Sequence, residues 1–447
     1  MAWRARFGRW RVVPTDIYLL LAGEFFLFTL GRGAFGPYAS AIVLYLCSLG
    51  ACVGLYKLTR HRGWPPPRLE AGASSSRWAV AAAVAVGLWL CVPPYIDAIR
   101  TTLPQDQSDI IMALTVYPQR WLAGQEVYRP LTAELGYFAL PTYLPATWFP
   151  FVVPELLHLD YRWMSGAIFA VGIAVYLYSV YRQRQPARRA FALALLPFGL
   201  LYAVMMTEPG VVGWTVELMI AGYYLLLVAS ILQRSYWGQA AMLIICLLSR
   251  FSLVFWVPLH LALLFFQGSR RVALGAAGAV AAGVLLLYVV PFLSHDWGMF
   301  MQVQHSYTDV ALNEWRHLNA QGRPLHLYNG IGLGNFFYRH GGGSLLSRLH
   351  SLQTVHIALL LIIVAGGAWL YWRQRAPRTD YRVYSVLVLK VYLTTFYAFV
   401  QVPYAYLACV GLFLSLFLAL IAARYPAEAE AEAEAEELRY VPLPSRA

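Results

Sequence analysis

The sequence predicts an all-helical protein that crosses a membrane many times. Sixty per cent of its 447 residues are hydrophobic and only 13 per cent are charged, whereas soluble domains carry about 25 per cent charge. Several apolar runs are longer than the roughly eighteen residues that a helix needs to cross a hydrocarbon core. These runs are continuous rather than alternating, which excludes a transmembrane barrel.

The apolar runs and the basic clusters together predict the topology. Arg and Lys collect on the cytoplasmic side of membrane proteins, and here they cluster at residues 4–11, 57–77, 182–189, 270–271 and 373–382. With these clusters inside, both termini are cytoplasmic and the N-terminus is an uncleaved start. The expected localisation is the inner (plasma) membrane. The spans expected from the apolar runs are 15–31, 37–56, 77–97, 163–181, 190–207, 211–232, 271–293, 355–372, 383–402 and 404–423.

Two further apolar segments do not fit as single spans. Segment 137–157 contains four prolines, and crossing there would place the cluster 182–189 outside. We therefore expect a helix that lies in the outer membrane surface or re-enters it. Segment 236–267 has basic flanks on both sides, so it must go out and return as two helices of about fifteen residues, each too short for a full crossing. With this hairpin the chain has about twelve membrane helices.

The predicted organisation has five parts. N-terminal helices and a linker occupy 1–76, a core with a large outer loop at 98–162 occupies 77–293, and a second large outer loop occupies 294–354. C-terminal helices follow at 355–424, and 425–447 form an acidic cytoplasmic tail. The net charge of +12 is spread over the ends of the spans, which indicates lipid contact and orientation rather than nucleic-acid binding.

Asp106 and Asp109 are the candidate catalytic residues. They stand in the first large outer loop, three residues apart, and would share one face of a helix. A carboxylate at a membrane surface can act as general base for a hydroxyl nucleophile. The alternative is helix capping, because an acidic residue before an apolar run is a common helix start. Asp109 is the preferred base because it directly precedes that run.

Arg250 is the candidate cation. A guanidinium inside an apolar hairpin costs about 3 kcal/mol, so it should face a cavity or a partner, and it is suited to binding a phosphate. The alternative is a structural pair with Glu217 or Glu208. Lys390 is expected to reach the cytoplasmic interface with its long stem.

The second outer loop has the composition of a sugar-binding surface. Its aromatic rings would stack on sugars and its polar groups, among them His326 and Asn329, would bind hydroxyls. The run 330–334, Gly-Ile-Gly-Leu-Gly, follows no strand and is therefore not a nucleotide fingerprint. No metal spacing is present, and we expect neither a metal nor a cofactor. A packed lid over the membrane helices is the alternative for this loop.

The chain resembles the GT-C superfamily of membrane glycosyltransferases, and most of all its bacterial polyprenyl-phosphate-sugar-dependent mannosyl- and arabinosyltransferases. The resemblance covers mainly residues 105–270. It departs from the family in placing the acidic loop after the third span and in having Pro145-Ala146 where a paired proline is usual. The elements that carry it are the acidic loop with Asp109 or Asp106, the run Trp121-Leu122-Ala123-Gly124-Gln125-Glu126-Val127-Tyr128, the start of the surface helix at Tyr143-Leu144-Pro145, and Arg250 before Phe251 and Pro258.

The resemblance implies a mechanism and a set of site residues. The donor would be a sugar on a polyprenyl phosphate, and the acceptor a hydroxyl of a glycan or lipid, with inversion at the anomeric carbon. Asp109 would take the acceptor proton, and Arg250 would neutralise the leaving phosphate. The further substrate-binding candidates are Gln107, Tyr128, Arg129, Tyr143, His326 and Asn329.

Two other functions remain open from the sequence. Broken helices and a buried arginine also suit a transporter or flippase for a lipid-linked or anionic solute. A non-catalytic membrane assembly protein is the third possibility.

Overall fold

The protein is a bundle of helices in which no sheet forms among the described residues. The computed structural model describes residues 13–62, 73–101, 109–131, 143–373 and 379–425. The β-pairing within these ranges is one isolated bridge between Leu318 and Pro324. Within these ranges eight helices are long and apolar enough to cross a membrane. The chain is therefore a multi-pass membrane protein, as the composition predicts.

The long apolar helices match the predicted spans in position. They are α2 (Pro14–Phe26) continued by η1 (Leu27–Gly31), α3 (Arg32–Arg62), α4 (Ala73–Arg100), α9 (Tyr161–Arg182), α10 (Ala187–Thr207), α15 (Arg270–Val284) continued by η4 (Leu285–Val289), α19 (Leu345–Arg373), and η6 (Ala405–Ala408) continued by α21 (Cys409–Ala422). The predicted span 211–232 is divided into the short α11 (Gly210–Gly213) and α12 (Glu217–Leu232).

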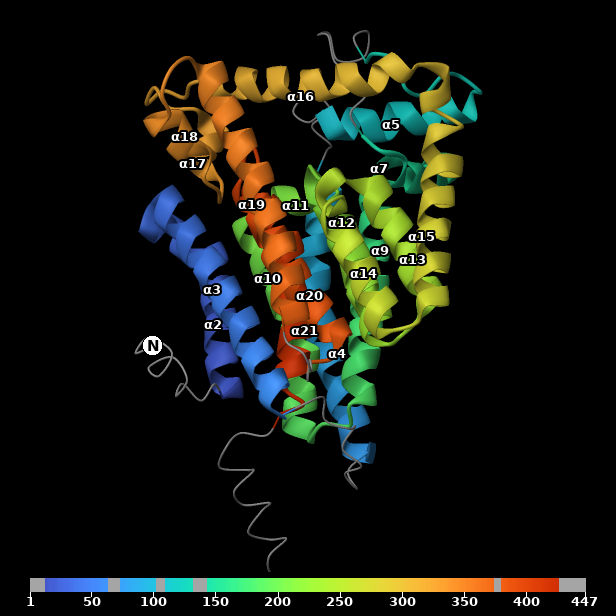
Figure 1. The fold of residues 1–447 in the computed structure, drawn as a ribbon, viewed down its shortest axis with the longest axis vertical. Helices are drawn as coiled ribbons and strands as arrows, with labels where there is room; N and C mark the ends of the chain where they lie inside the picture. Colours follow the sequence, from blue (N-terminus) through green and yellow to red (C-terminus); the bar gives the residue numbers. More distant parts are fainter. Residues whose placement is uncertain (1–12, 63–72, 102–108, 132–142, 374–378, 426–447) are drawn as a thin grey trace, which may run out of the picture.

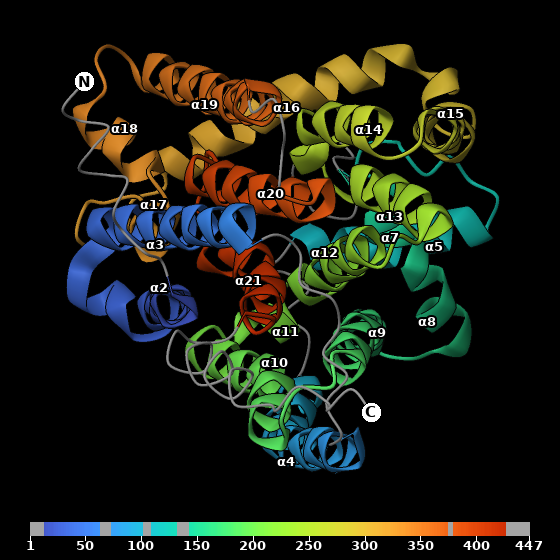
Figure 2. The ribbon, with the colours of Figure 1, turned by 60° about the horizontal axis from the view of Figure 1, so that its bottom comes forward.

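Helices α20 (Tyr381–Ala398) and α21 form the centre of the bundle (Figure 2). Nearly every residue of α21 is buried, and α20 is buried along most of its length. Helix α12 packs against α21, and α3, α14 and α19 pack against α20. A helix that is apolar on all sides is stable only where other helices surround it, so the sequence of α21 places it in the middle.

The predicted hairpin 236–267 is present as two short helices. Helix α13 (Tyr236–Ser249) has 14 residues and α14 (Trp256–Gln267) has 12. At 1.5 Å per residue they are about 21 and 18 Å long, which is less than a hydrocarbon core. The break between them holds Arg250 in an extended conformation, followed by the 3-10 turn η3 (Phe251–Leu253).

The polar connections gather at one end of the bundle, which we call the loop end (Figure 1). Helix α5 (Asp109–Leu122) lies there, and α16 (Trp297–Arg316) runs across the top of the bundle rather than along it. The proline-rich segment is broken as expected, into α7 (Pro145–Trp148), η2 (Phe149–Phe151) and α8 (Val152–Leu157). The remaining loop-end elements are η5 (Leu293–His295), α17 (Leu325–Asn329) and α18 (Gly334–His340).

Helix α19 begins at Leu345, ten residues before the span expected at 355–372. Apart from Leu346, the exposed residues of this extension are polar, and the extension lengthens the helix by about 15 Å. Gln353 donates to the hydroxyl of Thr308 on α16 at 3.1 Å. A small second core lies at this junction, formed by Ala311, Leu312, Trp315, Leu327, Leu349 and Leu352. Part of the second outer loop is therefore a packed structure with its own apolar interior.

Candidate functional site

Helix α5 begins at Asp109, so the backbone of this residue lies in the first helical turn at the loop end. A carboxylate is favoured there by the helix dipole, and a first-turn position is compatible with both of the roles predicted for it. The side chain of Asp109, and the whole of Asp106 and Gln107, lie outside the residues that the structure describes. The predicted base therefore has a described backbone position and no described contacts.

The turn after α5 is held by a buried arginine. Arg120 donates to the carbonyls of Val127 at 3.1 Å, Arg129 at 2.8 Å and Pro130 at 3.2 Å. Gly124 has a φ of 66°, a left-handed conformation that glycine adopts without strain. The Gly-Gln-Glu-Val-Tyr turn is thus a rigid structure, and its rigidity fixes the position of Tyr128.

Tyr128 is the centre of an aromatic cluster. Its hydroxyl donates to the carbonyl of Tyr143 at 2.8 Å and accepts from the indole of Trp148 at 2.9 Å. Burial raises the pKa of the Tyr128 phenol well above its usual value, so the group stays neutral and keeps its proton for the Tyr143 bond. The ring also packs edge-on against Phe292, with centroids 5.0 Å apart.

The surface segment docks directly on the broken hairpin. Thr147 of α7 donates to the carbonyl of Ser249, the last residue of α13, at 2.7 Å, and the hydroxyl of Tyr223 donates to the carbonyl of Ala146 at 3.2 Å. These bonds join helix α7 to the residue before Arg250 and to helix α12. The contact therefore brings the docked segment next to the break that holds Arg250.

Arg250 is paired with Glu217, one of the two partners that the sequence offered. Its guanidinium donates to the Glu217 carboxylate at the start of α12, and it lies against the phenol of Tyr397 on α20. Glu217 is 1 per cent exposed and the Arg250 side chain 23 per cent. The arginine thus keeps one accessible side while its charge is balanced from within the bundle.

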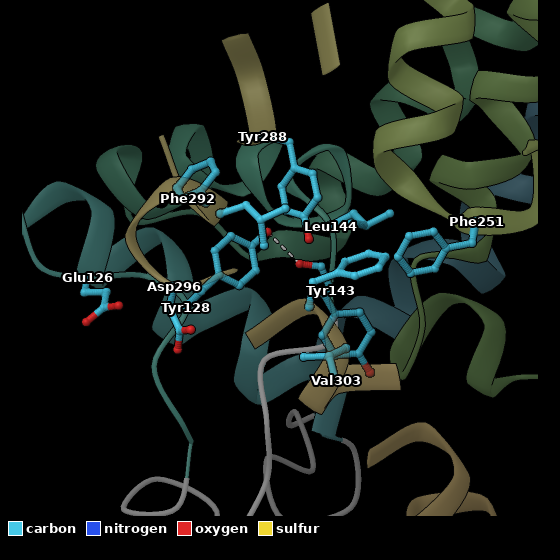
Figure 3. A pocket seen from close by; sticks show the side chains of 11 residues that line it. Glu126, Tyr128, Tyr143, Leu144, Phe251, Tyr288, Phe292, Asp296 and Val303 are labelled. Carbon is cyan, nitrogen blue, oxygen red and sulfur yellow. Dashed lines mark hydrogen bonds between the residues drawn. The ribbon is translucent and has the colours of Figure 1, made fainter. Parts of the chain in front are cut away.

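A cleft lies between the docked segment and the start of α16 (Figure 3). It measures about 460 Å³ including the space open to solvent. Phe251 lies at one end, and the carboxylates of Glu126 and Asp296 lie at the other. The rings between them pack closely, so the cleft is narrow. The remaining lining residues are Tyr128, Tyr143, Leu144, Tyr288, Phe292, Leu293, Phe300 and Val303.

The two carboxylates and several of the rings at this cleft were not among the predicted site residues. Asp296 follows an apolar run after two polar residues, whereas Asp109 was selected because it precedes one, so the same reasoning did not select Asp296. Glu126 belongs to the quoted run before Tyr128, but it was not given a role. No sequence pattern marks Tyr288 and Phe292 as site residues, because they belong to an ordinary apolar span.

The other predicted binding residues divide between two places. Tyr143 lines the cleft with Tyr128. Arg129 is exposed beside it and donates to the side chain of Gln125 at 3.2 Å. His326 and Asn329 belong to α17, which Figure 1 places beside α18 at the opposite side of the loop end from α5.

The prediction for Lys390 is wrong. The side chain is 2 per cent exposed and does not reach an interface; its Nζ donates to Glu24 at 2.9 Å and to the carbonyl of Gly411 at 2.8 Å. Ser415 donates to the same Glu24 oxygen at 2.6 Å, and Ser48 donates to the other. Four helices thus meet at one buried ion pair, and a carboxylate with these three donors is a better partner for an ammonium than the distant interface.

Fold and site together define a class of protein: a polytopic helical membrane protein with an aromatic, carboxylate-bearing cleft at one end and a paired arginine next in sequence to one of the lining residues. Among the described residues, no group of three or more His, Cys, Asp or Glu side chains is arranged to hold a metal ion. Comparisons with protein families, with curated proteins and with solved structures find no match for this chain.

Proposed function

We propose that the protein is a membrane glycosyltransferase of GT-C type, which moves a sugar from a polyprenyl-phosphate donor to a hydroxyl of a glycan or lipid acceptor. In this proposal the chain has about twelve helices in the plasma membrane, including the two short helices of the hairpin; both termini are cytoplasmic, and the loop end is extracytoplasmic. The orientation is supported by the turn between α9 and α10, which carries the basic cluster 182–189 at the end of the bundle away from α16.

The observation that carries the proposal is the docking of α7 on the end of α13. The bond from Thr147 to Ser249 joins the outer segment to the broken hairpin. As a result Phe251, the residue after Arg250, lines the same cleft as Tyr128 and Tyr143. The break that holds Arg250 and the narrow ring-lined cleft are therefore neighbours, and the proposal assigns the donor phosphate to the first and the sugar to the second.

The proposed chemistry is a single displacement. The carboxylate of Asp109 removes the proton of the acceptor hydroxyl, whose oxygen attacks the anomeric carbon of the donor. The bond from that carbon to the phosphate oxygen breaks, the phosphate leaves with the bonding pair, and the configuration inverts. Arg250 stabilises the negative charge that develops on the phosphate.

Glu217 has a defined role in this scheme. It holds the guanidinium of Arg250 in place before the donor binds and supplies the counter-charge that makes a buried cation tolerable. The exposed side of Arg250 is the one left for a phosphate. A bidentate guanidinium can keep one contact to Glu217 and offer the others to the ligand.

The proposal is tested with the purified protein in lipid vesicles and a panel of polyprenyl-phosphate sugars. Asp109→Asn separates the two roles of the residue, because asparagine starts a helix as well as aspartate but cannot act as a base. Loss of a general base lowers the rate by about 10²- to 10⁴-fold. The matched control is Asp97→Asn, an exposed carboxylate near the end of α4. Full transfer by both Asp109→Asn and Arg250→Ala would overturn the site.

A transporter or flippase is the second candidate, and the buried pair of Glu24 and Lys390 favours it. Ionisable groups inside a membrane domain often mark the path of a solute or a proton. The same vesicles, loaded with a lipid-linked sugar and supplied with an acceptor glycan, distinguish the two functions. Movement of the lipid-linked sugar between leaflets without transfer supports the transporter and contradicts the transferase.

A further inference from the structure

A row of four side chains at the loop end lies apart from the cleft. The Glu314 carboxylate on α16 is 3.6 Å from Nε2 of His326 on α17. The ring of His326 is 5.0 Å from that of Tyr404, and Tyr404 stacks on Tyr406 with centroids 5.2 Å apart and an angle of 8° between the ring planes. We call these four residues the tyrosine row.

The tyrosine row is accessible. His326 and Glu314 are 37 and 30 per cent exposed, and neither tyrosine is buried. Tyr406 also packs against the main core, so the row joins a carboxylate, an imidazole and two partly exposed rings at one anchored surface.

The backbone under the row is fixed, so the rings do not depend on a ligand for their position. Ile331 donates to the carbonyl of Pro403 at 3.1 Å, and the indole of Trp315 donates to the carbonyl of Gln401 at 2.9 Å. A Cβ on Gly330 would lie 1.5 Å from the oxygen of Pro403. The glycines of the run 330–334 therefore allow the segment 401–404 to pack closely against them, and this packing fixes the backbone position of Tyr404.

The side chains of the tyrosine row are suited to binding a neutral polyol. Ring faces accept the C–H face of a sugar, while a carboxylate and an imidazole bind its hydroxyls, which is the usual division in a site with few polar groups. The Glu314 carboxylate disfavours a phosphate or another anionic headgroup. The row and the cleft are separated by most of α16, since Asp296 precedes this helix and Glu314 stands near its end. Eighteen residues of helix correspond to about 27 Å.

We propose that the tyrosine row is a second carbohydrate site, which binds a neutral oligosaccharide several sugar units away from the reacting hydroxyl. The proposal rests on the proposed function, because it makes the acceptor an extended glycan whose far part lies on Tyr404 and Tyr406. The donor end of the reaction stays at the cleft and at Arg250.

The first test measures binding without any transfer. The full chain in lipid nanodiscs is titrated with neutral oligosaccharides of increasing length, and affinity is read by calorimetry. Tyr404→Ala is expected to weaken binding about tenfold through the lost ring contact, whereas Tyr404→Phe keeps the ring and is expected to bind as the unaltered protein does. Equal affinity of Tyr404→Ala and the unaltered protein at every length would overturn the proposal.

A second variant covers the case in which Tyr404→Ala does not fold. Glu314→Gln changes a partly exposed side chain, keeps its shape and removes only its charge; weaker binding of neutral oligosaccharides supports the proposal and unchanged binding contradicts it. Failure of the proposed function is a separate result. If binding depends on the row but no donor supports transfer, this site stands and the transferase is overturned. If transfer occurs and its rate is unchanged in Tyr404→Ala at every acceptor length, the transferase stands and this site is overturned.

Discussion

Removing Lys390 should destabilise the protein more than removing both members of its ion pair. Lys390→Met keeps the length of the side chain and deletes the charge. The Nζ loses its bonds to Glu24 at 2.9 Å and to Gly411 at 2.8 Å, and Glu24, at 0 per cent exposure, is left as a buried carboxylate with only Ser48 and Ser415. Breaking a buried pair on one side costs about 3–5 kcal/mol.

The double variant Glu24→Gln with Lys390→Met tests the physical reason. Without a stranded charge, and with an amide that still bonds Ser48 and Ser415, the cost should fall to about 1–2 kcal/mol. Unfolding is followed by far-UV circular dichroism during titration with a denaturing detergent. The exposed pair of Asp97 and Arg100 is the control, with nitrogen and oxygen 3.6 Å apart, and its removal should cost less than about 0.5 kcal/mol. A double variant as unstable as Lys390→Met would refute the reasoning.

Three further substitutions have expected outcomes. Gly330→Ala should displace the segment 401–404, because the added Cβ would lie 1.5 Å from the Pro403 oxygen; faster proteolysis at the loop end checks this, and cleavage at the unaltered rate would contradict it. Tyr128→Phe removes two hydrogen bonds and should cost about 1–3 kcal/mol in unfolding free energy, with no change refuting its structural role. Gly124→Ala should cost about 1 kcal/mol because its φ is 66°, and an unchanged stability would show that the turn adapts.

The span pattern and the broken hairpin could be predicted from the sequence because both depend on short-range properties. The length of an apolar run and the basic residues at its ends identify a membrane crossing. Two basic flanks about thirty residues apart require the chain to enter the membrane and return to the same side. The partner of Arg250 could be predicted only in part, because Glu217 and Glu208 were both candidates and the choice between them depends on how α12 packs against α13.

The cleft and the Lys390 pair could not be predicted, because they depend on which helices become neighbours. Glu24 and Lys390 are 366 residues apart in the sequence, and nothing local indicates that α2 meets α20. Similarly, His326 was grouped with Tyr128 by composition, whereas α16 keeps α17 and the cleft at opposite sides of the loop end. Composition predicted one sugar-binding surface, and it did not indicate that the predicted residues lie in two separate places.

The most direct test of the central claim is sugar transfer by the protein in vesicles with a polyprenyl-phosphate sugar and an acceptor glycan. The account predicts transfer by the unaltered protein and by the Asp97→Asn control, with a loss of about 100-fold or more in Asp109→Asn and a comparable loss in Arg250→Ala. Transfer at the full rate by both site variants, or no transfer by the unaltered protein with any donor of the panel, would contradict it.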